Sequence, residues 1–195
     1  MNNAKSLHRK GLELQQVGKH EEAIAYFDKA IEFEPNNAEL LYDKAISLQQ
    51  LFRFEDAIIF YDKSLEIEPN SFAALINKGL CFSNPNINKQ KEAVFCFEEA
   101  VKNEPNDLGA QALRGYSLDS MGRYREAIDC FDKVLEQEPN ELNVLVNKGL
   151  SLSHLGEYDE AIAYFDKVLD DEPDNLFALE WKKDAIKMRD RYLLF

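Results

Sequence analysis

The stretch Ala25–Asn37 reads AYFDKAIEFEPNN, and Ala163–Asn175 reads AYFDKVLDDEPDN. Three stretches between them, FYDKSLEIEPNS, CFEEAVKNEPND and CFDKVLEQEPNE, keep the same order of an aromatic residue, two charged residues and a closing Glu-Pro. Their prolines are separated by 34, 36, 34 and 34 residues, and they are Pro35, Pro69, Pro105, Pro139 and Pro173. A fixed period of this length is typical of a solenoid built from repeated units.

Alignment on the prolines produces further columns of similar residues. A small residue fills one column, with Gly11, Ala45, Gly79, Gly115 and Gly149. Alanine fills another, with Ala23, Ala57, Ala93, Ala127 and Ala161, and an aromatic residue follows each alanine by four, at Phe27, Tyr61, Phe97, Phe131 and Phe165. Spacings of three and four residues place such columns on one face of a helix. Each repeat is therefore predicted to hold a first helix with the small residue, helix A, and a second helix with the aromatic residue, helix B.

The predicted helix ends have local signals. Gly18, Gly122 and Gly156 suit the left-handed residue that ends a helix. Proline closes helix B because it disfavours helix at the residue before it, and the Asn, Asp or Ser that follows can cap the next helix A. The third repeat departs from this pattern, with two extra residues in CFSNPNINKQKEA and no turn glycine. There we expect helix A to stop before Pro85. The two extra residues are either a tolerated loop insertion or part of a segment in which Ile87 folds back into the position of an aromatic residue.

On these columns the chain resembles the tetratricopeptide repeat family. The resemblance implies an all-α, right-handed superhelical solenoid of stacked antiparallel helix pairs, with a concave groove lined by A helices. We expect one solenoid domain over residues 1–195, with repeats at 4–37, 38–71, 72–107, 108–141 and 142–175 and a capping helix at 176–195. In that last helix Leu176 and Leu179 are predicted to pack on repeat five, with a polar outer face.

Composition limits the classes of function. The chain has 23 Lys and Arg against 36 Asp and Glu, a net charge of −13, which disfavours nucleic acid and anionic membrane surfaces as partners. Its three cysteines have no paired spacing, and no apolar run approaches membrane-spanning length. We therefore expect a cytoplasmic protein without disulfides.

No pattern typical of catalysis is present in the sequence. The three histidines lie in different repeats, and neither a metalloprotease motif nor a phosphate-binding loop occurs. We predict no catalytic residue, no cofactor and no metal, and hence no enzyme. The repeated Asp-Lys pairs, such as Asp28-Lys29 and Asp132-Lys133, are interpreted as a solvated surface with weak ion pairs.

The resemblance places ligand contacts on helix A residues that do not face helix B. The predicted peptide groove consists of His8, Leu12, Tyr42, Ile46, Ile76, Asn77, Leu80, Leu113, Tyr116, Val146, Asn147 and Leu150. An apolar stripe with a polar border often marks an interaction site, although packing between neighbouring A helices could also use part of it. Asn77 and Asn147 resemble the asparagine ladder by which some family members hold a peptide backbone. The cationic residues with which other members grip a chaperone's terminal carboxylate are missing, so that partner class is rejected.

These features predict a non-catalytic protein-interaction scaffold that binds a peptide segment or a partner helix in its groove. The alternative is a scaffold that self-associates through the groove or the C-terminal helix. The final RYLLF carries apolar residues with no helix B to join, and we expect weak self-association through this tail.

Overall fold

The computed structural model describes residues 3–192, which form eleven helices joined by short turns and loops. Its contacts divide the chain into two compact units, unit 1 at Met1–Pro105 and unit 2 at Asn106–Phe195. The helices of unit 1 are α1 (Asn3–Gln16), α2 (His20–Phe33), α3 (Ala38–Gln50), α4 (Phe54–Ile67), α5 (Phe72–Ser83) and α6 (Gln90–Asn103). The helices of unit 2 are α7 (Leu108–Ser120), α8 (Tyr124–Leu135), α9 (Leu142–Leu155), α10 (Tyr158–Asp171) and α11 (Leu176–Tyr192).

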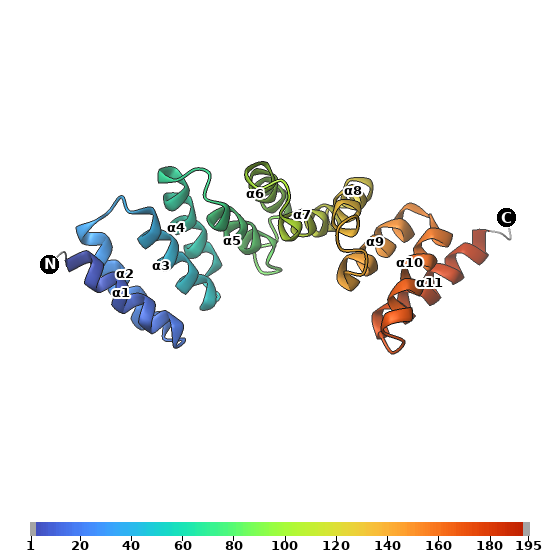
Figure 1. The fold of residues 1–195 in the computed structure, drawn as a ribbon, viewed down its shortest axis with the longest axis horizontal. Helices are drawn as coiled ribbons and strands as arrows, with labels where there is room; N and C mark the ends of the chain where they lie inside the picture. The colour runs from blue at the N-terminus through green and yellow to red at the C-terminus, as the bar shows by residue number, and fades with distance from the viewer. Residues whose placement is uncertain (1–2, 193–195) are drawn as a thin grey trace. The chain divides into compact units, whose positions relative to one another are not determined.

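Consecutive helices form antiparallel pairs, and within each unit every pair packs on the next (Figure 1). In both units helix B of one repeat contacts helix A of the following repeat. The predicted all-α architecture of stacked helix pairs is confirmed. The last three residues of the RYLLF tail, 193–195, lie outside the described residues.

The core of each helix pair is the predicted aromatic residue of helix B. Phe27, Phe97, Phe131 and Phe165 are fully buried. A Cβ atom added at the facing glycine of helix A would lie only 2.4–2.7 Å from the nearest ring carbon. The small column is therefore a steric requirement of the crossing between helices A and B. In repeat two the small residue is Ala45, and the aromatic residue opposite it is the buried Tyr61. The Tyr61 hydroxyl donates a hydrogen bond to Gln49 Oε1 at 2.6 Å.

The turns between paired helices share one conformation with different residues. Gly18, Gly122 and Gly156 have φ of 76°, 74° and 82°, as predicted. In repeats two and three Phe52 and Asn88 occupy this left-handed position, with φ of 59° and 48°. Asparagine tolerates such backbone angles, whereas a bulky phenylalanine is strained there. The sequence signal for this turn was glycine alone, so the strained position of Phe52 was not predicted.

The irregular third repeat follows its predicted course. Helix α5 ends at Ser83, ahead of Asn84 and Pro85. Ile87 then packs, partly buried, against the core cluster that contains Phe54 and Cys81. Of the predicted helix caps, Asn37 and Asp107 accept backbone N–H bonds, and Asn175 does so for Ala178, whereas Ser71 makes no side-chain cap bond.

The interpretation of the Asp-Lys pairs as a merely solvated surface was incomplete. The aspartate of helix B forms an ion pair with a lysine of the next helix A, as in Asp62 and Lys78 at 2.5 Å. The same pairing joins Asp28 to Lys44, Asp132 to Lys148 and Asp166 to Lys182. These lysines are much less exposed than the aspartates, so the pairs hold neighbouring repeats together at a partly desolvated boundary.

The prediction for the last helix needs a correction. Leu176 is 78% exposed and Leu179 is 44% exposed, so neither packs into repeat five. Ala178 and Ala185 are buried instead. The register of α11 is that of another helix A, in which Leu179 and Lys183 occupy positions that would face a helix B. Of the residues predicted for the polar outer face, Lys183, Asp184 and Lys187 are exposed, whereas Lys182 is partly buried in its ion pair with Asp166.

Candidate functional site

The predicted groove residues lie on A helices in both units. Unit 1 carries His8 and Leu12 on α1, Tyr42 and Ile46 on α3, and Ile76, Asn77 and Leu80 on α5. Unit 2 carries Leu113 and Tyr116 on α7, and Val146, Asn147 and Leu150 on α9. All of them keep part of their surface accessible. Because helix B covers the opposite face of each A helix, these residues form one exposed face within each unit.

Part of this face also packs within the protein. The Tyr42 ring lies 5.8 Å from that of Tyr61, and the Tyr116 ring lies 5.5 Å from that of Phe131. Burial raises the pKa of both Tyr42 and Tyr116 above that of a free tyrosine, with neighbouring carboxylates adding to the effect. Each tyrosine therefore packs against the core with one side of its ring, and the rest of the side chain stays accessible on the A-helix face.

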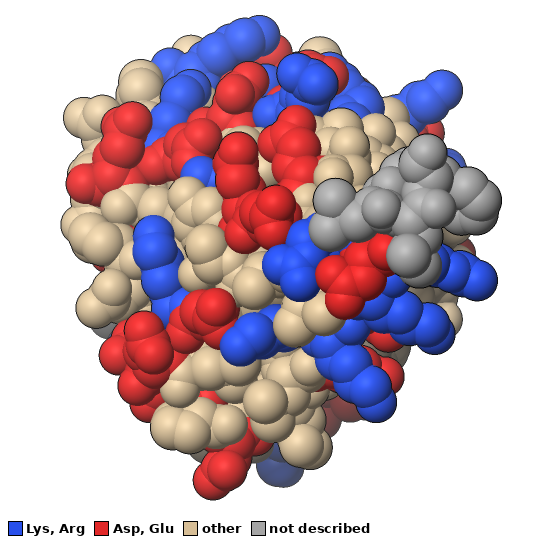
Figure 2. Space-filling view, turned by 90° about the vertical axis from the view of Figure 1, so that its right-hand side faces the viewer, with Lys and Arg blue, Asp and Glu red and all other residues tan. Residues whose placement is uncertain are grey.

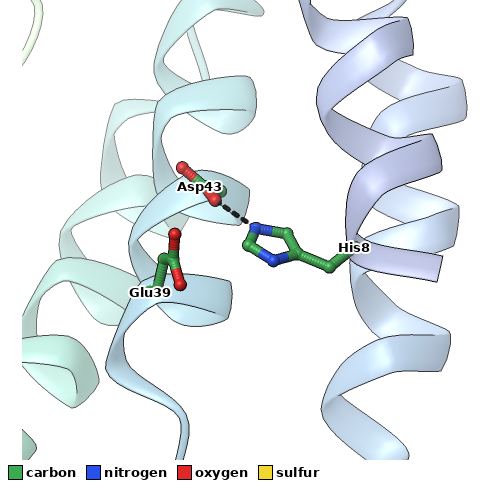
Figure 3. Close-up of side chains that lie close together, drawn as sticks. All are labelled: His8, Glu39 and Asp43. Atoms are coloured by element: carbon green, nitrogen blue, oxygen red, sulfur yellow. Dashed lines mark hydrogen bonds and ion pairs between the residues drawn. The ribbon is translucent and has the colours of Figure 1, made fainter. Parts of the chain in front are cut away.

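In unit 1 a polar cluster lies between α1 and α3, at the start of the predicted groove face (Figure 3). His8 Nε2 lies 2.6 Å from Asp43 Oδ2, and Glu39 extends from the same face of α3 toward them. Burial raises the pKa of the Asp43 carboxyl, and the hydrogen bond and charge of His8 offset only part of that rise. Gln15 Nε2 donates to the Asp43 carbonyl at 2.9 Å, which adds a second polar link between the two helices.

The ligand atoms of His8, Glu39 and Asp43 lie within 4.8 Å of one another, close enough for a metal site to be considered. Two ligands of a tetrahedral zinc ion stand about 3.3 Å apart, given bond lengths near 2.0 Å. The His8–Asp43 separation is instead that of a hydrogen bond. A hollow of about 290 Å³ beside His8 is lined by Lys5 and Arg9 as well as by Glu34 and Glu39, so its charges balance and do not favour a cation. The arrangement is best suited to joining repeats one and two.

The asparagines predicted as ladder rungs both bond to their own helices, and Asn77 also bonds to α3. Asn77 Nδ2 donates to the Ala73 carbonyl at 2.9 Å and to the Tyr42 hydroxyl at 3.1 Å. Asn147 Nδ2 donates to the Asn143 carbonyl at 2.7 Å. Since an amide side chain both donates and accepts, these bonds orient each carboxamide while its oxygen remains an acceptor for a peptide N–H.

A hollow of about 480 Å³ lies on this face in unit 2. Three predicted groove residues of α9, Val146, Asn147 and Leu150, line it together with Phe177 and Trp181 of α11. Leu142, Asn143, Glu172 and Asn175 complete the lining. Phe177 is 70% exposed, an unusual environment for a phenylalanine that contributes nothing to a core. The hollow is thus mostly apolar, with amide groups at its edges and one carboxylate.

Phe177 and Trp181 were missed in the sequence because residues 176–195 were assigned to a cap. A signal existed, since the 34-residue period places Trp181 in the column of Asn147 and Phe177 in that of Asn143. Figure 2 looks onto the side of unit 2 that carries α11 and shows Lys and Arg side chains gathered there. α11 has five basic residues against three acidic ones, so its charge contrasts with the acidic chain as a whole.

Two tetratricopeptide repeat models match residues 4–37 and 38–71. A model described as anaphase-promoting complex, cyclosome, subunit 3, matches residues 86–168. No curated protein matches the chain significantly.

Solved structures share the fold over nearly the whole chain. YrrB, described as a TPR protein with an unusual peptide-binding site, is 25% identical with a TM-score of 0.86, and the match covers 93% of each chain. MamA from Desulfovibrio magneticus is 26% identical with a TM-score of 0.82, over 90% of this chain and 98% of that one. A tetratricopeptide repeat protein from Parabacteroides merdae, 19% identical, has a TM-score of 0.86 over 96% of this chain and 74% of that one.

The fold and the exposed A-helix face define a helical repeat protein of the class that generally serves as non-catalytic interaction scaffolds. The chain belongs to the tetratricopeptide repeat family. None of the helices in residues 3–192 has the length and apolar character that a membrane span requires.

Proposed function

We propose that the protein is a non-catalytic scaffold that binds a peptide segment or a partner helix on its A-helix face. The hollow of unit 2 carries this proposal, because Phe177 and Trp181 present aromatic surface in it that the helix pairs do not bury. Aromatic residues supply much of the binding energy in protein interfaces when a partner desolvates them. The peptide-binding site described for YrrB, which shares the fold, supports the same class of function.

The lining predicts the chemistry of the ligand. Glu172 is the one charged residue among the side chains that line the hollow, and Leu142, Val146, Leu150 and the two aromatics supply its apolar surface. A partly apolar, mostly uncharged segment fits such a surface. Its affinity should depend little on salt, because screening acts on charge pairs that this hollow lacks.

Trp181 makes the proposal directly testable, because it is the single tryptophan of the chain. Peptides are first selected against the whole protein from a random displayed library. Their binding should shift the fluorescence emission of Trp181 to shorter wavelength and protect that fluorescence from quenching by acrylamide. Val146→Ser should weaken binding of the same peptides about tenfold, whereas Ile59→Ala, outside the groove, should leave binding unchanged. If no selected peptide alters Trp181 emission and all of them bind the Val146 variant equally well, the assignment is refuted.

In unit 1 we propose that Tyr42, Ile46, Ile76, Asn77 and Leu80 form a second stretch of the binding face. Tyr42→Ala and Asn77→Ala should weaken peptides that engage this unit while helicity is retained. Fluorescence anisotropy with labelled peptide measures the affinity of each variant at low and at physiological salt, and circular dichroism measures helicity. A steep salt dependence would instead place the peptide on the charged B-helix surface.

The exposure of α11 favours a second candidate function, self-association. Leu176 and Leu179 are exposed on α11, and Leu179 occupies a position where other repeats receive a helix B. Sedimentation velocity over a range of concentrations tests this candidate, with Leu176→Ser and Leu179→Ser expected to shift the protein toward the monomer. A truncation after Arg191 removes most of the tail for which we expect weak self-association, and so separates the contribution of the tail from that of Leu176 and Leu179. A cytoplasmic location remains a prediction from composition.

A further inference from the structure

The B helices of unit 1 expose large apolar side chains on three successive repeats. Ile59 of α4 and Phe95 of α6 are 50% and 60% exposed and occupy the same column of the repeat. Phe33 and Ile67 share another column near the ends of α2 and α4, and both are exposed. We call Phe33, Ile59, Ile67 and Phe95 the outer stripe.

The fold does not require these side chains. Ile59 lies two residues from both Ala57 and Tyr61, which are buried, so a rotation of about 200° turns it away from the core. Phe95 has the same relation to Ala93 and Phe97. In unit 2 the matching positions hold Asp129 and Ala163 in one column, and Gln137 and Asp171 in the other. An identical helix pair therefore forms with polar or small residues at these places.

Charge around the outer stripe is strongly one-sided. Helices α2, α4 and α6 carry eleven acidic residues against four basic ones, a net charge of −7. The A helices of the same unit carry three acidic residues against five basic ones, a net charge of +2 with neutral histidine. The apolar residues thus lie on an acidic surface, on the side of unit 1 opposite the groove face.

We propose that the outer stripe is a second docking surface, distinct from the groove, for a basic amphipathic helix of a partner protein. The partner's apolar face would cover Ile59 and Phe95, and its lysines or arginines would meet the acidic residues of α2, α4 and α6. Apolar contacts provide affinity in such an interface, while charge complementarity provides orientation and a fast association rate. A second copy of this chain fits less well, because it would bring two molecules of charge −13 together.

The test uses a labelled helical peptide of about 18 residues, five turns of helix, with leucines along one face and lysines elsewhere. It is titrated into the whole protein by fluorescence anisotropy and mapped by backbone amide NMR. We expect shifts in α2, α4 and α6. The double variant Ile59→Gln and Phe95→Gln, which preserves the net charge, should raise the Kd at least tenfold. Both residues are half exposed or more, so its circular dichroism and Tm should remain close to those of the parent.

Two controls separate this surface from the groove and from bulk charge. The double variant Phe177→Gln and Trp181→Gln removes the exposed aromatics of the groove hollow and should leave the Kd within about twofold. A peptide with its leucines replaced by serine keeps the charge and should lose binding. Unchanged binding to the outer-stripe variant, or loss of binding in the groove variant, would overturn the proposal. A dimer without peptide that dissociates in the outer-stripe variant would also overturn it, since a second copy would then be the occupant.

Discussion

Unit 1 and unit 2 bury the same core and expose different surfaces. Phe27 and Phe131 are both fully buried against a glycine of the paired helix, and the inter-repeat lysine-aspartate pair occurs in both units. On their outer faces, unit 1 has Ile59 and Phe95, where unit 2 has Asp129 and Ala163. Core positions thus obey the geometry of helix crossing, while exposed positions are free to diverge and so carry the evidence for function.

The largest expected effect tests the equivalence of the two cores. Phe131→Ala and Phe27→Ala should each lower the unfolding free energy by about 3–5 kcal/mol, since each removes a buried ring from a close-packed site. Urea denaturation monitored by circular dichroism measures the loss. A loss below about 1 kcal/mol in either variant would show that its aromatic residue does not organise the helix pair.

Substitutions at the small residues of the A helices test how strictly each helix pair limits side-chain size at the crossing. Gly115→Ala should cost about 2 kcal/mol, because its Cβ would meet the Phe131 ring at 2.5 Å and the crossing would have to open. Ala45→Gly in repeat two should cost less, about 1 kcal/mol, which is the helix propensity difference. If Gly115→Ala were neutral, the glycine column would reflect no steric limit.

The buried lysine of unit 2 makes stability dependent on alkaline pH. Burial alone would lower the pKa of Lys148, but hydrogen bonds to Asp132 and Tyr164 outweigh it and raise the pKa above its ordinary value of 10.5. A raised pKa means that the folded state favours the charged lysine, so this contribution is complete below pH 10.5 and is lost as pH rises through the folded-state pKa.

Lys148→Met should therefore cost about 1–2 kcal/mol at pH 7, where Asp132 loses its partner. Unfolding curves of parent and variant should converge in strongly alkaline solution. Lys167→Met, which removes an exposed lysine of α10, is the matched control and should change stability little. Parallel curves for parent and Lys148 variant across the alkaline range would contradict a role for the paired charge.

The smallest expected effect concerns the turns. Phe52 is 78% exposed, and its ring centroid lies 6.0 Å from that of Phe54 in an edge-to-face arrangement. Little burial therefore offsets the strain of its left-handed backbone conformation. Phe52→Gly should raise stability by about 1 kcal/mol, and Gly156→Ala in unit 2 should lower it by a similar amount. Apart from its two chain neighbours, no described residue has an atom within 4 Å of a Cβ at Gly156, so that change isolates backbone strain. Destabilisation by Phe52→Gly would show that the ring supports the turn.

The repeat pattern predicted the fold because a period of 34 residues with concordant proline, small, alanine and aromatic columns leaves few ways to bury those columns. The small and aromatic residues, the proline stops and the glycine turns were all readable, as were the A-helix positions that stay partly accessible on the side away from helix B. The peptide groove itself remains a prediction. Phe177 and Trp181 were missed because a terminal helix was interpreted as a cap, although its register continues that of α9.

The sequence by itself determined the helix pairs, because propensity, caps and periodic burial act over a few residues and recur in every repeat. Only the tertiary structure decided which charges meet, since Asp28 and Lys44 lie 16 residues apart on different helices. It also decided that His8 bonds Asp43, that Leu176 faces solvent and that a hollow opens between α9 and α11. These features depend on the angle and spacing at which neighbouring helices pack, and a pattern along one chain does not record them.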